Sequence, residues 1–434
     1  MSPAAVGGIG ILALLGALFF LGMPVGFAMA VVGFAGFSYL ISLQAGLGMI
    51  GSVVWDVFST YSLTVIPLFI LMGQIAFYSG VNENLYTAAY KWVGHIRGGI
   101  AMATVMACAA FSAICGSNAA TAATMSTVAL PQMKRFGYDP RLSTGAVACG
   151  STLGVVIPPS VVLIVIGLST EQSIVRLFYG GIGAGLCLAI LLTLTVWLVC
   201  KRHPEWGPVG PVFSMGERFR SLGGAVEMLL LFLLVMLGLY FGFFTPAEAG
   251  AAGSFFALAI SVARRRLSWK GFLAAVTDTL RISCMVVAII AGAVIFGRFL
   301  TVTRIPYDIA AWVAGLPIPP AAILGIVFSV YIVGGAVMDA LALLLITIPV
   351  FFPVAERLGY DPVWFAVTIT VVTTLGAVTP PVGATTYVVG GMAEGVRLEE
   401  VFKGVAWFLP AYILCIVLLV IFPELVTFLP KYLP

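Results

Sequence analysis

Two apolar stretches of this sequence are each broken near the middle by a pair of prolines. The stretches and their breaks are residues 141–170 with Pro158-Pro159, and residues 362–393 with Pro380-Pro381. Proline lacks a backbone N–H and clashes with the preceding helical turn, so no continuous helix passes through either pair. Inside a membrane, the backbone groups freed by such a break must lie against other protein or line a wet cavity.

The composition places these stretches in a membrane. Of 434 residues, 61% are hydrophobic and only 9% are charged, whereas about a quarter are charged in a soluble domain. We therefore predict an all-α polytopic membrane protein. The net charge of +4 is explained by Lys and Arg in cytoplasmic loops, and nucleic acid is not expected as a partner. Apolar runs with the length of a membrane-spanning helix, about 20 residues, are expected near 5–22, 25–43, 63–80, 174–200, 224–243, 247–263, 271–297 and 404–422.

Two longer apolar blocks predict helical hairpins. Residues 98–133 are interrupted at Gly116-Ser117-Asn118, and residues 317–352 are interrupted between Gly334 and Asp339. Short surface helices are expected over 83–97 and 306–316.

The sequence contains an internal repeat. FGYDP at 136–140 recurs as LGYDP at 358–362, and TLGVVIPP at 152–159 recurs as TLGAVTPP at 374–381, both at an offset of 222 residues. Two motifs in one register indicate a duplicated fold. We assign residues 1–222 and 223–434 to the two repeats, each with one hairpin and one broken helix.

The distribution of basic residues indicates that the repeats are inverted. With the termini of the long helices placed by their charges, the segments assigned to the cytoplasm hold 15 Lys and Arg, and those assigned outside hold 5. This satisfies the positive-inside rule and puts the two GYDP loops on opposite sides of the membrane. The inside segments are 81–97, 134–141, 201–220, 264–270 and 394–403; the outside ones are 44–62, 171–176, 244–250, 298–308, 356–361 and the C-terminus.

Inverted repeats with hairpins and broken helices predict a secondary transporter whose site lies near the membrane midplane. Unwound carbonyls can coordinate a cation, and half-helix N-termini can face an anion. Bound sodium and a carboxylate substrate fit this pattern. The absence of G-x-S-x-G, H-E-x-x-H and G-x-x-x-x-G-K-[ST] motifs argues against an enzyme, and a channel would not require inverted hairpins closing on one site.

We predict two matching sodium sites, each between a hairpin tip and the polar residues beside a Pro-Pro break. The first comprises the hairpin-tip residues Ser117, Asn118 and Thr121 and the break residues Ser151, Thr152 and Gly154. The second comprises Gly335, Asp339, Thr373, Thr374, Gly376 and Thr379. Substrate is expected to contact Ser117, Asn118, Thr121, Pro158, Asp339 and Pro380.

Each of these residues also has a local interpretation. Ser and Thr in membrane helices often bond the preceding turn, and Asp339 can cap a helix. An ionised Asp near the midplane costs at least about 2.5 kcal/mol, so we favour cation ligation or proton coupling for Asp339. For Arg281 we favour a local ion pair with Asp278, three residues earlier, over a substrate contact. The seven cysteines form no C-x-x-C pair, so neither a disulfide framework nor a zinc site is expected.

Several segments resemble the large membrane subunit of tripartite ATP-independent periplasmic (TRAP) transporters. These segments are GMPVGFAM at 22–29, FTPAEAGAA at 244–252, GAVMDALALLLITIPVFFPVAERLGYDP at 335–362, GAVTPPVG at 376–383 and FPELVTFLP at 422–430. The resemblance covers nearly the whole chain. It implies an elevator-type carrier of the bacterial inner membrane, with scaffold helices and a transport domain that both draw on the two repeats, driven by a sodium gradient with two or more ions.

The resemblance also implies partners, namely a small four-helix membrane subunit and a periplasmic substrate-binding protein that delivers an organic acid such as a C4-dicarboxylate or sialic acid. The first hairpin tip, CGSNAATAA at 115–123, departs from the Gly-Ser-Ala-like tip common in this family. Ser-Asn-Thr-like tips also resemble stand-alone sodium/dicarboxylate symporters, which work without a binding protein and are the alternative.

Overall fold

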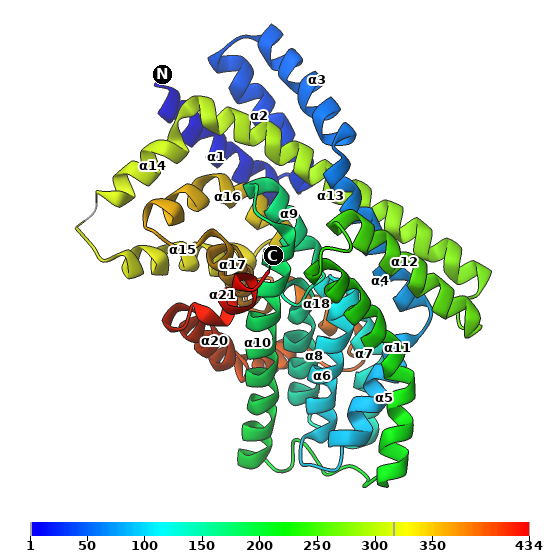
Figure 1. Ribbon diagram of the computed structural model, residues 1–434. Coiled ribbons are helices and arrows are strands. Elements are labelled where there is room, and N and C mark those ends of the chain that lie inside the picture. The colour runs from blue at the N-terminus through cyan, green and yellow to red at the C-terminus, as the bar shows by residue number, and fades with distance from the viewer. Residues whose placement is uncertain (1, 316, 434) are drawn as a thin grey trace.

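The computed structural model describes residues 2–315 and 317–433, and within these ranges the regular secondary structure is helical (Figure 1). Six of the described helical segments are long and apolar enough to cross a membrane unbroken. They are Tyr61–Tyr78, which contains α4 (Val65–Tyr78), and α10 (Ile174–Arg202), α11 (Met215–Tyr240), α12 (Pro246–Ala263), α13 (Trp269–Thr303) and α16 (Ala340–Arg357). The predicted all-α polytopic membrane fold is confirmed.

The bent pair α19 (Leu398–Ala406) and α20 (Leu409–Ile421) has the length and composition of a further span when its helices are taken together. Shorter apolar helices include α1 (Pro3–Phe19) and α2 (Val25–Leu40). Helix α2 crosses α13 at very short range. A Cβ on Gly26 would lie only 2.8 Å from the carbonyl oxygen of Ala288. Glycine at this position lets the two backbones approach.

Both hairpins form where the sequence predicts them. The first consists of α6 (Gly99–Cys115) and α7 (Asn118–Arg135), and the second of α15 (Pro320–Gly335) and α16. At the first tip Gly116 adopts a φ of +63°, a left-handed conformation that glycine tolerates without a Cβ penalty. The chain reverses there within two residues.

The two Pro-Pro pairs interrupt their helices as expected. The first broken helix consists of α8 (Pro140–Ser151), a 3₁₀ turn η2 (Thr152–Val155) and α9 (Val161–Thr170). The second consists of α17 (Pro362–Val378) and α18 (Ala384–Met392). Their first halves start alike, since Asp139 caps α8 and Asp361 caps α17, two residues that are 222 positions apart.

The helices of the two halves do not all correspond. Residues that match the single 35-residue helix α13 form two helices in the first half, α3 (Leu43–Ser59) and α4, separated by the 3₁₀ turn η1 (Tyr61–Thr64). The same fold element is thus straight in one half and broken in the other.

Three of the segments assigned to the outside are largely helical. Residues 44–62 are mostly α3, which buries Met49, Val53 and Val57 along one side. Residues 298–308 contain the end of α13 and the start of α14 (Ile305–Ala314). The C-terminus forms α21 (Glu424–Lys431), which packs on α10 and buries Val426. Polar and apolar residues are mixed in these segments, and the apolar ones are buried on one side of the helix. A search for continuous apolar runs does not detect this pattern.

The expected surface helices are confirmed as α5 (Val81–Val93) and α14, apart from Leu316, which lies outside the described residues. The expected Asp278–Arg281 ion pair was wrong. Asp278 accepts a hydrogen bond of 2.6 Å from the hydroxyl of Tyr78 on α4, and the ion pairs found among the described residues do not include Arg281.

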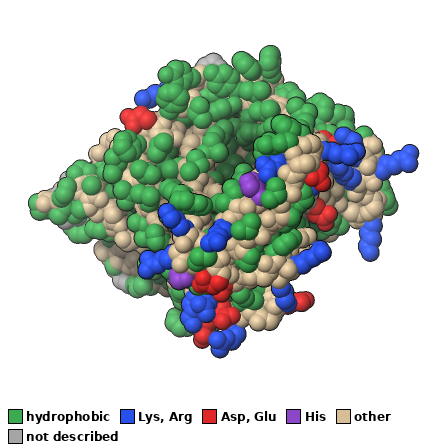
Figure 2. All heavy atoms as spheres, turned by 90° about the horizontal axis from the view of Figure 1, so that it is seen from below, with side chains coloured by type: hydrophobic (Ala, Val, Ile, Leu, Met, Phe, Trp, Pro, Cys, Tyr) green, Lys and Arg blue, Asp and Glu red, His purple; other side chains and the backbone are tan. Residues whose placement is uncertain are grey.

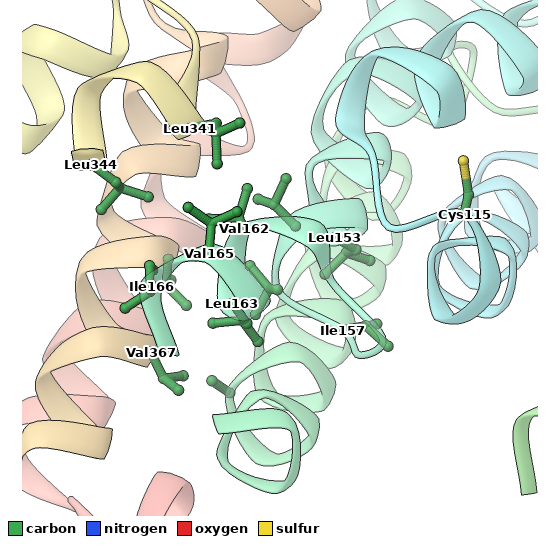
Figure 3. Packing of buried hydrophobic residues seen from close by; sticks show 14 of the residues in the cluster. Cys115, Leu153, Ile157, Val162, Leu163, Val165, Ile166, Leu341, Leu344 and Val367 are labelled. Atoms are coloured by element: carbon green, nitrogen blue, oxygen red, sulfur yellow. The ribbon is translucent and has the colours of Figure 1, made fainter. Parts of the chain in front are cut away.

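Elements of the two halves pack directly on one another. Figure 3 shows α9 of the first broken helix with Val162 and Val165 directed toward Leu341 and Leu344 of the second hairpin. Further along α9, Ile166 approaches Val367 of α17 (Figure 3), and these side chains belong to one buried apolar cluster. The hairpins and broken helices therefore share a core rather than forming separate halves.

Candidate functional site

The first hairpin tip lies directly against the first helix break. A Cβ on Gly154 would lie 2.7 Å from the carbonyl oxygen of Ser117, and one on Gly116 would lie 2.8 Å from that of Pro159. Both separations are too short for any larger residue without movement of the backbone. The structure thus brings together Ser117, at the tip, and Gly154, at the break, as the sequence predicts.

The polar side chains of this tip differ in what they bond. Ser117 caps α7 through a weak contact of 3.5 Å from the Ala120 N–H, and Thr121 donates to the Ser117 carbonyl at 2.8 Å. The side-chain oxygen Oδ1 of Asn118 is buried and has no hydrogen-bond partner among the described residues. A buried carbonyl oxygen without a donor is costly, and it is the kind of group that a cation satisfies.

Thr152 is held by a residue that the sequence did not single out. Its hydroxyl donates to the Cys149 carbonyl at 2.7 Å and lies 2.6 Å from the hydroxyl of Tyr412 on α20. Tyr412 also donates to the Cys149 carbonyl at 3.0 Å. Nothing in the apolar sequence around Tyr412 marks it as part of the site, because its role depends on a contact between residues 260 positions apart.

The second tip is built on the same plan. A Cβ on Gly335 would lie 2.7 Å from the Thr373 carbonyl oxygen, and one on Gly376 would lie 2.5 Å from that of Ile332. Two backbone N–H groups just after the second Pro-Pro pair, from Val382 and Gly383, donate to the Ala336 carbonyl at 3.0 and 2.9 Å. The second hairpin tip is therefore hydrogen-bonded to the second break.

Asp339 caps α16 through its Oδ1, which accepts from the Leu341 N–H at 2.9 Å. The local capping role is thus present, and it leaves further lone pairs on the carboxylate. The side chain of Asp339 is exposed to solvent. Asp339 also occupies the position 222 residues after Ser117, so the two tips carry a carboxylate and a hydroxyl at equivalent places.

The threonines of the second break bond locally. The hydroxyls of Thr373, Thr374 and Thr379 donate to the carbonyls of Ile369, Val371 and Gly376 at 2.7, 2.6 and 3.0 Å. Each hydroxyl oxygen keeps a lone pair after donating, so back-bonding and cation ligation are compatible. These bonds hold the side chains in fixed rotamers.

The two breaks differ in access. Pro158 and Ser160 of the first break are buried, and Ser160 caps α9 at 3.3 Å from the Leu163 N–H. Pro380 and Val382 of the second break are exposed. Ser160 and Val382 are equivalent by the 222-residue offset, and their exposed fractions are 0% and 38%. The first break is therefore buried and the second is exposed in this conformation.

The helix N-termini around the tips favour anions. Helices α7 and α16 begin at the tips, and α18 begins at Ala384 without a side-chain cap. Free N–H groups at a helix N-terminus carry a partial positive charge. The region therefore combines oxygen ligands for a cation with backbone donors for an anion, two groups of opposite charge that can be bound side by side.

Comparison with known proteins agrees with this geometry. Residues 12–425 match the family model described as "Tripartite ATP-independent periplasmic transporter, DctM component". The chain belongs to this family. TRAP large permeases are multi-pass proteins of the inner membrane, and the described helices fit that location. The family match favours a TRAP subunit over the stand-alone symporter.

Two curated relatives illustrate the similarity. The C4-dicarboxylate TRAP transporter large permease protein DctM of Pseudomonas aeruginosa is 34% identical over 374 residues, which cover 85% of this chain and 84% of the relative. The sialic acid TRAP transporter large permease protein SiaM of Vibrio cholerae is 29% identical over 415 residues, covering 95% and 96%. A solved structure, the YdaH transporter of Alcanivorax borkumensis, matches with a TM-score of 0.65 and 15% identity over 89% of this chain and 91% of that one, which shows a shared fold.

Proposed function

We propose that this TRAP large permease imports an organic acid in symport with sodium, and that the two tip-and-break sites bind the coupling ions. The observation that carries the proposal is the matched contact of each hairpin tip with a helix break, through Gly154 in one half and Gly376 in the other. Oxygen-bearing residues lie beside both contacts, and a hard cation prefers oxygen ligands. The chain is not proposed to catalyse a chemical reaction.

The first ion is assigned to Ser117, Asn118, Thr152 and Gly154, with Asn118 Oδ1 as the ligand that otherwise lacks a partner. The second is assigned to Gly335, Asp339, Thr374, Gly376 and Thr379. In the second site the Asp339 carboxylate supplies the negative charge. Sodium bound there neutralises that carboxylate, so an anionic substrate can approach the N-termini of α16 and α18 without repulsion.

The substrate is proposed to be a carboxylate, as the names of the P. aeruginosa and V. cholerae relatives indicate for those proteins. It would contact Ser117, Asn118, Thr121, Asp339 and the Pro158 and Pro380 turns. We further propose that a periplasmic binding protein delivers it and that a small four-helix membrane subunit completes the permease. Movement of the shared core of hairpins and broken helices as one body would carry the site across the membrane.

Proteoliposomes test this proposal when the three components are combined and then omitted in turn. Uptake of the organic acid should require the binding protein, the small subunit and an inward sodium gradient together. Uptake by the large subunit alone, or uptake that is unchanged when the sodium gradient is replaced by potassium, would refute the proposed function.

Replacing Asn118 by Ala should weaken the apparent sodium affinity of transport about 10-fold, because a lost ligand to a charged group costs about 1.5–3 kcal/mol. Asn118→Asp is the matched variant, since it keeps an oxygen at the same place and should retain tight sodium binding. Sodium dependence of initial uptake rates measures both. Equal sodium affinities for the Ala variant and the unmodified protein would remove Asn118 from the site.

Alternating access predicts opposite accessibilities for equivalent residues of the two breaks. In a background where the exposed Cys284 is replaced by Ser, Val382→Cys should react rapidly with a membrane-impermeant thiol reagent, and Ser160→Cys should be protected. Adding sodium with substrate should reduce the difference between the two reaction rates, because turnover exposes the first break. Rates that are the same at both positions, with and without sodium, would contradict alternating access between these breaks.

A further inference from the structure

A large apolar groove lies outside the tip-and-break sites, between α10 and α11. Its volume is about 930 Å³, near the upper end of the range of about 300–1,000 Å³ for small-molecule pockets. Helix α6 forms its floor through residues such as Met102 and Met106, and its walls include Ile190 of α10 and Leu229 of α11. Apart from Thr193, the side chains that line it are apolar. The groove is therefore suited to hydrocarbon.

One end of the groove is basic on both walls. On α10, Lys201 follows the lining residue Trp197 by four positions, and its Nζ lies 5.2 Å from the centre of the Trp197 ring. On α11, Arg218 precedes the lining residue Leu222 by four positions. Residues four apart share a helix face. Lys201 and Arg218 therefore lie at the same end of the groove, on the helix faces that line it.

This end is the one that the sequence assigns to the cytoplasm. The helix ends there are joined by residues 203–214, and Figure 2, which views the molecule from this side, shows Lys and Arg gathered over the surface. The nearest acid on α11, Glu217, closes a capping box by accepting from the Ser214 N–H at 2.9 Å. Its carboxylate is thus engaged by the helix cap.

The ion pairs among the described residues do not include Arg218. Its carbonyl accepts from Trp92 of α5 at 3.2 Å, and its guanidinium lies 3.4 Å from His95 Nδ1. Its side chain is half-buried. A guanidinium that is held in place and carries no carboxylate partner is suited to a phosphate, which accepts hydrogen bonds from it well.

We propose that the groove between α10 and α11 binds a phospholipid with an anionic headgroup. Its acyl chain lies along α6, and its phosphate contacts Lys201 and Arg218. Bulk lipid would cover any apolar surface, but two cations at the end of a defined groove select headgroup charge. The proposal does not depend on sodium coupling or on the identity of the substrate.

Native mass spectrometry of the purified permease tests the proposal with two probes, dioleoylphosphatidylglycerol and dioleoylphosphatidylcholine. The unmodified protein should retain one phosphatidylglycerol with a preference of about 30-fold over phosphatidylcholine, since each basic residue near an anionic headgroup contributes about 1 kcal/mol. The double variant Lys201→Gln/Arg218→Gln should lose this preference. The matched double variant Arg202→Gln/Arg220→Gln changes the net charge equally on the same helices, at positions that are not four residues from a residue lining the groove, and it should keep the preference.

A steric variant separates the groove from its basic end. Ala225 lines the groove on α11, so Ala225→Trp should reduce retention of both lipids while gel filtration shows an intact protein. Three results would overturn the proposal. The first is equal retention of the two lipids by the unmodified protein, and the second is an equal loss of the preference for phosphatidylglycerol in the two charge variants. The third is no retained lipid at all, which would indicate that a helix of the small subunit fills the groove.

Discussion

Replacing Asp339 by Asn should weaken the sodium affinity of transport about 10- to 100-fold while leaving the protein folded. Asp339 caps α16, and Asn caps helices about as well as Asp does. The substitution therefore keeps the structural role and removes the charge. The loss of a charged ligand costs about 1.5–3 kcal/mol, which sets the expected range. Initial uptake rates measured against sodium concentration give the affinity.

The matched variant for this test is Asp339→Ser, which copies the residue at the equivalent position of the first tip, Ser117. It should also cap α16 and should bind sodium as weakly as Asp339→Asn does. If both variants keep a sodium affinity within about twofold of the unmodified protein, Asp339 serves only as a cap and the second sodium site is misplaced.

Replacing Gly376 by Ala should reduce uptake by about 5- to 100-fold. The new Cβ would lie 2.5 Å from the Ile332 carbonyl oxygen and 2.8 Å from the backbone of Gly335. These are backbone atoms, so the hairpin tip must move away from the break. Overpacking of this kind costs about 1–3 kcal/mol, and the displacement separates the ligands that the two elements contribute. Uptake in proteoliposomes measures the effect.

Gly391→Ala provides the control for this prediction. Gly391 lies in α18 of the same broken helix, and a Cβ there meets no atom within 4 Å. It should transport normally, and thermal unfolding should show that both variants fold. Equal uptake by the two alanine variants would show that close contact at Gly376 is not needed for transport.

Much of this architecture could be predicted because the membrane restricts what a backbone break can mean. The Pro-Pro pairs, the polar tip at Ser117 and the acid at Asp339 stand out against apolar sequence, and the 222-residue offset pairs them. In the structure each tip contacts its own break, as the pairing suggests. Helix caps such as Asp139 and Asp361 follow from the same repeat.

What the sequence could not provide depends on contacts between distant segments. Tyr412 holds Thr152 from another helix, and Tyr78 bonds Asp278 across α4 and α13, where the sequence suggested a pair with Arg281. The amphipathic helix α3 and the terminal helix α21 were missed because a one-sided apolar pattern is weaker than a continuous run. The different exposure of Ser160 and Val382 belongs to one conformation, which no sequence repeat can encode.

We propose that two sodium ions drive transport through the paired tips. The initial rate of substrate uptake at rising sodium concentration, in proteoliposomes that contain the complete transporter, tests this coupling. We expect the rate to rise more steeply than the first power of sodium concentration, and to follow the first power in Asp339→Asn. Uptake that does not depend on sodium, or that rises only with its first power in the unmodified protein, would refute coupling to two ions.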